Sequence, residues 1–299
     1  MIANGDPTCE MIVHGRALRL PLSHTIPELL ATGPQHDRQL GRLAAFLRAR
    51  RGRLVAIDVG ANVGDTLAAI ASTAGGTDDC FLAIEPSGEF QRYLVSNWGH
   101  DPRVTIVNAA CGARNAEVRA TMQRRDGTAI LTEQAEGSLV RMATLDAVVR
   151  DHPVFSKPDL LKIDTDGFDF AVIDGARETL RVARPAVFFE CDHFNVPDYV
   201  ERVRRALGQL QECGYEHVVA YDNFGYLMGC YALRDALAFE QLLFYQLASP
   251  FYYFDLLALP EDALAVFLER EREHYVLSAV PAALVNDARA VAPRIAAAD

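Results

Sequence analysis

Five short apolar runs along the chain each end in an acidic or amide side chain. Because these runs are continuous rather than alternating, they are typical of parallel strands that helices cover on both faces. Ligands of such sheets bind at the carboxyl ends of the strands, so we expect five polar side chains at one edge of one sheet. The runs are Leu54–Asp58, Phe81–Glu85, Val104–Asn108, Leu160–Asp164 and Ala186–Glu190.

The net charge, the cysteine spacing and the hydropathy of the chain exclude several classes of function. The net charge of −11 argues against nucleic acid, whose binding rests on cationic side chains. None of the six cysteines forms a Cys-x-x-Cys pair, so we do not expect a zinc module. We expect the protein to reside in the reducing cytoplasm. The most apolar segment, 241–259, is interrupted by Gln246 and Pro250 and carries Asp255, so we predict no membrane span.

Three zones follow from the pattern. Residues 1–52 carry a β segment and a helix and form an N-terminal cap, and residues 53–233 hold the five runs and a hairpin near Tyr226. Residues 234–299 contain two helical patterns and are expected to pack on the central zone as a helical extension.

A glycine-rich turn follows the first run and opens a helix. Gly60 and Gly64 allow a tight turn, and Asn62 tolerates the left-handed region. The dinucleotide fingerprint Gly-x-Gly-x-x-Gly fails here, because Asn62 and Asp65 occupy its third and sixth positions. An Asp at the start of a helix repels a pyrophosphate, so the turn favours a ligand with positive charge, such as S-adenosylmethionine.

Glu85 ends the second run, 21 residues beyond Gly64. A carboxylate at this position accepts hydrogen bonds from both ribose hydroxyls in dinucleotide folds. The alternative is that Glu85 only precedes Pro86 in a turn.

These motifs resemble those of FkbM-type methyltransferases, which are class I S-adenosylmethionine-dependent O-methyltransferases. The resemblance runs from about Pro21 to Glu190 and implies a Rossmann-like α/β fold. That fold has a mostly parallel seven-stranded sheet with one antiparallel strand, and helices on both faces. The matching blocks are Ile57–Asp65, Ala83–Ser87, Asn108–Gly112, Thr144–Asp146, Leu161–Gly167 and Gly175–Ala176.

The resemblance also implies the cofactor contacts. The methyl donor would be S-adenosyl-L-methionine, with S-adenosylhomocysteine as the product. The chain departs from the family at Thr165–Gly167, where Val-Glu-Gly is common, and at Asp169, where Glu is common. Carried over by position, the contacts are Asp58 near the methionine end, Gly60, Asn62 and Gly64 beneath the cofactor, Glu85 on the ribose, and Asn108, Ala109 and Ala110 along the adenine.

Methyl transfer to oxygen needs an aligned hydroxyl and a proton acceptor. Asp164 and Asp166 end the fourth run, and His193 follows the fifth. We predict that Asp164 contacts the cofactor and that His193 and Asp166 are the candidate bases, with His193 favoured for its neutral imidazole. Alternatively, Asp166 only caps the helix near Gly167, and His193 is an ordinary polar residue on a surface loop.

The acids after the fourth run could also hold a metal. Asp164, Asp166, Asp169 and Asp174 lie close in sequence. A calcium loop needs Gly at its sixth position, and Gly167 is fourth. We predict no resident metal, with a single Mg²⁺ bridged by substrate oxygens left open.

The acceptor is expected to be a sugar or glycan hydroxyl, within polysaccharide biosynthesis. The alternatives are a polyketide-type or other small natural product, or a non-catalytic nucleoside-binding protein. An aromatic stretch, Phe244–Phe254, leaves three interpretations open: core packing, a sugar-stacking platform or a homodimer face.

Overall fold

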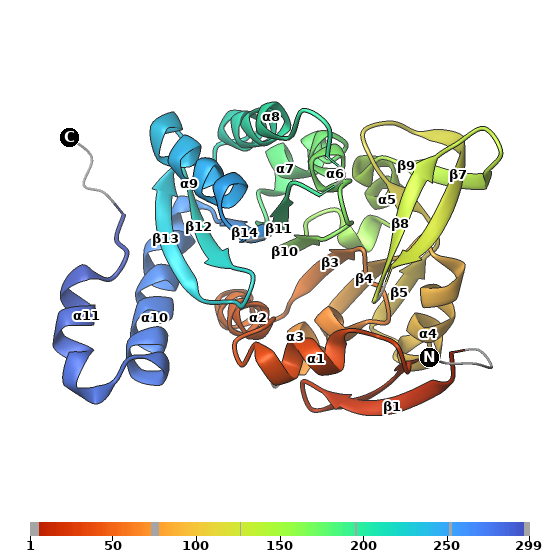
Figure 1. The fold of residues 1–299 in the computed structure, drawn as a ribbon. Coiled ribbons are helices and arrows are strands. Elements are labelled where there is room, and N and C mark those ends of the chain that lie inside the picture. Colours follow the sequence, from red (N-terminus) through yellow and green to blue (C-terminus); the bar gives the residue numbers. More distant parts are fainter. Residues whose placement is uncertain (1–5, 73–77, 126, 195, 251–252, 296–299) are drawn as a thin grey trace.

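The protein is built around one sheet of eight strands, seen edge-on in the centre of Figure 1. This computed structural model describes residues 6–72, 78–125, 127–194, 196–250 and 253–295. In spatial order the strands are β13 (Leu227–Ala232), β12 (His217–Asp222), β14 (Tyr253–Ala258), β11 (Ala186–Asp192), β10 (Leu160–Ile163), β3 (Val55–Val59), β4 (Cys80–Ile84) and β5 (Val104–Val107).

All five apolar runs form neighbouring parallel strands, so that prediction is confirmed. Alternate residues of each strand enter different cores, as the pleat requires. In β3, Val55 and Ile57 pack into the core on one face and Ala56 into the core on the other. Burial on both faces explains why the runs are continuous in hydrophobicity.

The strand β14 lies inside the sheet although it is the last strand in the chain. It pairs antiparallel with both β11 and β12. The hairpin strand β13 is also antiparallel to β12. The α/β class with a mostly parallel sheet is therefore confirmed. Within the residues that the structure describes, the sheet has eight strands with two antiparallel to the rest, where seven with one were expected. The segment after residue 233 contributes this central strand as well as helices.

Helices cover both faces of the sheet. The apolar residues between sheet and helices form the two cores. One face packs against α1 (Ile26–Thr32), α2 (Arg38–Arg51), α3 (Asp65–Ser72), α4 (Gly88–Trp98) and α10 (Glu261–Ala279). The other packs against α5 (Leu145–Asp151), α6 (Asp169–Asp174), α7 (Arg177–Ala183), α8 (Tyr199–Glu212) and α9 (Ala236–Ala248). Within the described ranges, no helix combines the length and apolarity that crossing a bilayer would require.

Two further β units flank the carboxyl edge of the main sheet. The N-terminal cap is a hairpin of β1 (Thr8–Val13) and β2 (Arg16–Pro21) followed by α1 and α2. A second sheet, which the sequence pattern did not predict, follows β5. It contains β6 (Ala110–Cys111), β9 (Ser138–Ala143), β7 (Ala116–Arg125) and β8 (Thr128–Glu133).

Leu256 tests whether the C-terminal segment belongs to the central core. Its side chain in β14 is fully buried, so Leu256→Ala should lower the free energy of unfolding by about 2–5 kcal/mol. Leu277 in α10 is 66% exposed, and Leu277→Ala should change it by less than about 0.5 kcal/mol. Urea denaturation measures both. Equal midpoints for the two variants would show that β14 is dispensable to the sheet.

Candidate active site

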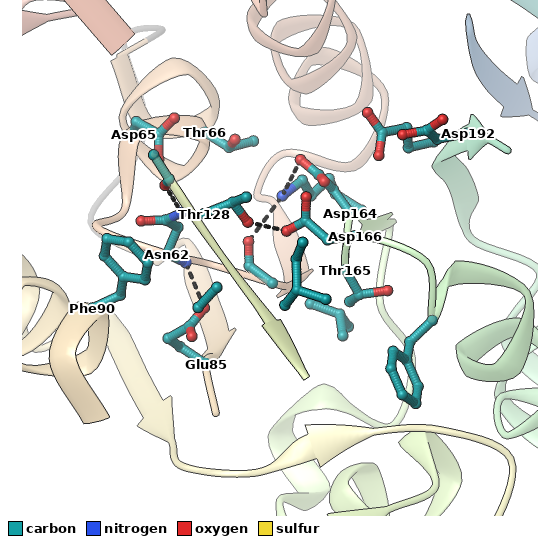
Figure 2. A pocket seen from close by; sticks show the side chains of 18 of the residues that line it. Asn62, Asp65, Thr66, Glu85, Phe90, Thr128, Asp164, Thr165, Asp166 and Asp192 are labelled. Carbon is teal, nitrogen blue, oxygen red and sulfur yellow. Dashed lines mark hydrogen bonds and ion pairs between the residues drawn. The ribbon is translucent and has the colours of Figure 1, made fainter. Parts of the chain in front are cut away.

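A cavity of about 640 Å³ opens at the carboxyl ends of the parallel strands. Its wall includes Gly60 after β3, Glu85 after β4, Asp164 after β10 and Glu190 of β11. This volume suits a cofactor-sized ligand. Three of the five polar strand ends, Glu85, Asp164 and Glu190, line this cavity, where five were expected at the sheet edge. Figure 2 shows Glu85 and Asp164.

The glycine-rich turn is held in a conformation that needs its small residues. Gly60 and Gly64 have φ of 81° and 87°, and Asn62 between them has φ of 48°. A Cβ on Gly60 would lie 1.7 Å from the carbonyl oxygen of Asp164, and one on Gly64 would lie 2.2 Å from Nε1 of Trp98. The turn thus packs directly against the end of β10 and against α4.

Glu85, which follows β4, is hydrogen-bonded to the glycine-rich turn. Its Oε2 accepts a hydrogen bond from the Asn62 amide at 2.9 Å, and its Oε1 accepts one from the Ser87 amide at 2.7 Å. Burial raises the pKa of Glu85 to about 7, against the lowering effect of these two amides. Each carboxylate oxygen has a second acceptor position, so Glu85 can still accept bonds from a ligand in the cavity.

Lys162 of β10 lies at the floor of the cavity and joins two carboxylates. Its Nζ is 3.1 Å from Oδ1 of Asp58 and 3.4 Å from Oδ2 of Asp164, and it donates to the carbonyl of Gly60 at 3.2 Å. Burial raises the pKa of Asp58 to about 6, although the nearby Lys162 charge lowers it. Asp58 is 2% exposed, so it supports Lys162 from below rather than facing the cavity.

The structure brings most of the residues singled out in the sequence to this cavity. Asn108 instead has an exposed side chain whose Nδ2 donates to Oε1 of Gln91 at 2.7 Å, and Gly64 packs on Trp98. The predicted site residues that line the cavity are Gly60, Asn62, Glu85, Ala109, Ala110, Asp164, Asp166 and His193; Asp58, Gly64 and Asn108 are not part of its lining.

The two candidate bases both reach the cavity. Asp166 has φ of 50°, and its Oδ2 accepts a hydrogen bond from the hydroxyl of Thr128 (Figure 2). Burial, and then the charge of Asp164, raise the pKa of Asp166 to about 6. His193 sits at the cavity wall with its ring edge-on to Tyr199, at 6.1 Å between centroids.

Two chain segments that the sequence did not assign to the site close over it. Nε2 of His24 in the cap lies 3.3 Å from Oδ1 of Asn62, and the Asn62 side-chain amide donates to the carbonyl of Gly127 at 2.8 Å. Gly127 begins the turn into β8, so the cap, the glycine-rich turn and the second sheet meet at Asn62. These contacts join residues 38 and 65 positions apart, and no local pattern indicates them.

The residues of the aromatic stretch Phe244–Phe254 differ in their surroundings, because some lie in α9 and others in β14. Tyr253 and Asp255 of β14 line the cavity, while Phe254 between them is buried in the core, as alternation along a strand requires. Phe244 on α9 is 72% exposed. Phe251 and Tyr252 lie outside the described residues. A lone Asp in an apolar segment was the signal that could have assigned Asp255 to the site.

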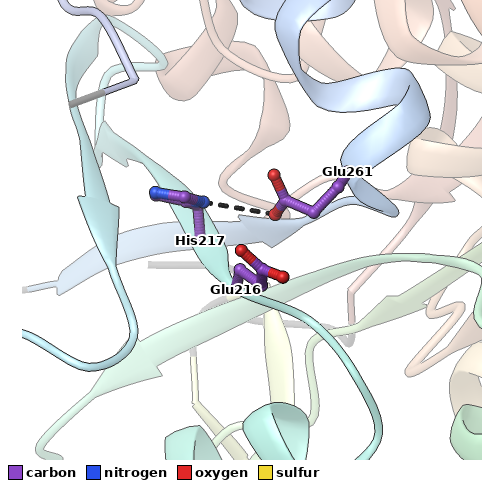
Figure 3. A group of neighbouring side chains, drawn as sticks. All are labelled: Glu216, His217 and Glu261. Atoms are coloured by element: carbon purple, nitrogen blue, oxygen red, sulfur yellow. Dashed lines mark hydrogen bonds and ion pairs between the residues drawn. The ribbon is translucent and has the colours of Figure 1, made fainter. Parts of the chain in front are cut away.

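A different cluster lies at the opposite edge of the sheet. Among the residues that the structure describes, Glu216, His217 and Glu261 are the group whose ligand atoms converge closely enough to hold a metal ion (Figure 3). Nδ1 of His217 is 3.2 Å from Oε1 of Glu261. Glu261 is the first residue of α10, where a carboxylate complements the helix dipole, and this accounts for its place.

Residues 58–217, more than half of the chain, match the family described as Methyltransferase FkbM domain. No curated protein sequence matches the chain significantly.

Three of the solved structures to which the chain is similar illustrate the extent of the likeness. A methyltransferase FkbM from Methylobacillus flagellatus is 13% identical, with a TM-score of 0.41, and the match covers 71% of this chain but only 47% of that one. The O-methyltransferase TomG from Streptomyces achromogenes is 15% identical over 74% and 79% of the two chains, with a TM-score of 0.41. Fibrillarin from Aeropyrum pernix is 12% identical over 86% and 83%, with a TM-score of 0.40.

The matched segment begins at Asp58 and contains the glycine-rich turn, Glu85, Asp164 and the second sheet. The chain therefore belongs to the FkbM family of class I, Rossmann-like methyltransferases, and its cofactor is S-adenosyl-L-methionine.

Proposed function

We propose that the protein is an O-methyltransferase that moves the methyl group of S-adenosyl-L-methionine to a hydroxyl of a sugar or glycan. The observation that carries this proposal is a single cavity lined by both kinds of group the reaction needs. Gly60, Asn62 and Glu85 form a wall for a nucleoside-bearing cofactor, and Asp166 and His193 supply proton acceptors.

The residues present fit this cofactor. Glu85 is placed for the ribose hydroxyls, Asp164 for the ammonium group, and Ala109 beside Ile84 offers an apolar surface for the adenine. Asp65, the first residue of α3, also lines the cavity, where it disfavours a pyrophosphate and favours a cationic ligand. When bound, the cofactor supplies an activated methyl carbon.

The chain's own residues orient the acceptor and receive its proton. With Oδ2 of Asp166 engaged by Thr128, the other oxygen, Oδ1, is available to accept the proton of the acceptor hydroxyl. A pKa of about 6 leaves this carboxylate mostly ionised at neutral pH while keeping it a useful base. Thr128 and Leu131 of β8 line the cavity and exclude water from it.

A hydroxyl-rich acceptor is supported by the rest of the lining. Glu190, Asp192 and Asp255 are carboxylates, which accept hydrogen bonds but donate none when ionised. Sugar hydroxyls are matching donors. An apolar polyketide surface would leave these acceptors desolvated and without partners, which is costly.

Cofactor binding tests the donor side. S-adenosylhomocysteine should stabilise the protein by about 2.7 kcal/mol at 100 times its Kd, and NAD⁺ should not. Glu85→Gln removes hydrogen bonds to a charged acceptor worth about 1.5–3 kcal/mol each, so calorimetry should show affinity at least about tenfold weaker. Glu178→Gln, an exposed change in α7, is the matched control. Unchanged affinity in Glu85→Gln would place the ribose elsewhere, and stabilisation by NAD⁺ alone would reject the methyltransferase.

Labelled methyl transfer tests the base. Asp166→Asn should lower kcat about 10²–10⁴-fold without changing the Kd for S-adenosylhomocysteine. Because the reactive form is deprotonated, the wild-type rate should rise as pH increases through about 6, the pKa of Asp166. Asp262→Asn, an exposed site paired with Arg50, should have no effect. If His193→Ala abolishes transfer while Asp166→Asn preserves it, the imidazole is the base instead.

A further inference from the structure

Three carboxylates form a row across neighbouring strands at the cavity. Glu190 of β11 pairs directly with Asp255 of β14. Ile163 pairs with Phe189 on the other side of β11, so the same register places Asp164, the next residue, beside Glu190. Neighbouring strands lie about 4.8 Å apart, so this carboxylate row (Asp164, Glu190 and Asp255) concentrates negative charge on one face of the sheet. All three residues line the cavity.

The positive charge of Lys162, which lines the cavity, does not neutralise the carboxylate row. Lys162 lies within 3.4 Å of Asp164 but is shared with Asp58. Within the described part of the chain, the carboxylates of Glu190 and Asp255 receive no hydrogen bond and form no ion pair. Like charges directly opposite one another on paired strands are destabilising. Burial and the neighbouring carboxylates raise the pKa of both well above the usual range, so the pair loses charge when no cation is near and ionises when one binds.

A cationic ligand would remove this repulsion. An ammonium group has three donors and no acceptor, and its hydrogen bonds to carboxylate are about 2.8 Å long. One ammonium can therefore bridge two carboxylates on adjacent strands, whose Cβ atoms are about 5 Å apart. S-adenosyl-L-methionine carries one net positive charge, and Asp164 at the end of the row is its partner in the proposed function. That leaves Glu190 and Asp255 for the acceptor.

We propose that the acceptor is an amino sugar, or a similar hydroxylated amine, whose protonated amino group is bound between Glu190 and Asp255. This inference rests on the proposed function, because it names the class of substrate for the same cavity. It also disfavours acceptors that carry phosphate or carboxylate, because the row offers them no countercharge. A divalent metal is the rival occupant, but the described residues lining the cavity present no three ligand atoms converging as metal ligands do.

Matched sugars test the charge requirement. Glucosamine, N-acetylglucosamine and glucuronate present similar hydroxyls with positive, zero and negative charge. At pH 7, the protein saturated with S-adenosylhomocysteine should bind glucosamine at least about tenfold more tightly than N-acetylglucosamine, and should not bind glucuronate, by calorimetry. Equal or tighter binding of the neutral or acidic sugar, or no binding of glucosamine, would overturn the inference.

Variants locate the effect. Glu190→Gln and Asp255→Asn should each weaken glucosamine binding at least about tenfold while leaving S-adenosylhomocysteine binding unchanged. Glu178→Gln and Asp262→Asn remove the same charges at exposed positions and should change neither. Should a row variant fail to fold, the comparison of the three sugars on the wild-type protein still decides.

Two other results would reassign the row. Weakened S-adenosylhomocysteine binding in both row variants, with glucosamine unaffected, would make it the site of the cofactor's own ammonium. A saturable stabilisation by Mg²⁺ alone that both variants lose would make it a metal site. In each case the amine is rejected. Cofactor binding and methyl transfer are measured in separate experiments, so rejecting the amine would not reject the proposed function.

Discussion

The buried side chain of Lys162 connects two central strands of the sheet to the glycine-rich turn. Lys162 projects from the middle strand between Asp58 on its neighbour and Asp164 above it, and bonds the carbonyl of Gly60. A buried cation without partners would be prohibitively costly, so its position requires both carboxylates and the tight turn together. Removing either carboxylate would leave charge uncompensated at the point where two strands and the cofactor turn meet.

Carboxyl groups whose pKa is raised lie near Lys162 around the cavity. Burial raises the pKa of Glu85 to about 7, and burial together with a neighbouring carboxylate raises that of Asp166 to about 6. Shifts of this kind gather at functional sites, where a group must be a base or bind a cation near neutral pH. The same charge density favours a sulfonium cofactor and disfavours phosphorylated ligands.

Part of the cavity wall comes from segments outside the parallel core. Asn62 is the junction, because it contacts Glu85 through its amide, His24 through its side-chain oxygen and Gly127 through its side-chain nitrogen. The N-terminal cap and the second sheet therefore both contact one residue of the cofactor turn. Through these contacts, a change in the cofactor turn can reach the other segments that line the cavity.

The sequence by itself determined the parallel strands, the turn at Gly60 and the acids at strand ends, because continuous burial and left-handed backbone leave local signatures. Tertiary structure alone decided three other features. It inserted β14 into the sheet and so set Asp255 beside Glu190, it placed Asp58 under Lys162, and it folded the hairpin of β8 over the cavity. These features depend on contacts between residues 65 to 104 positions apart, for which a sequence carries no periodic signal.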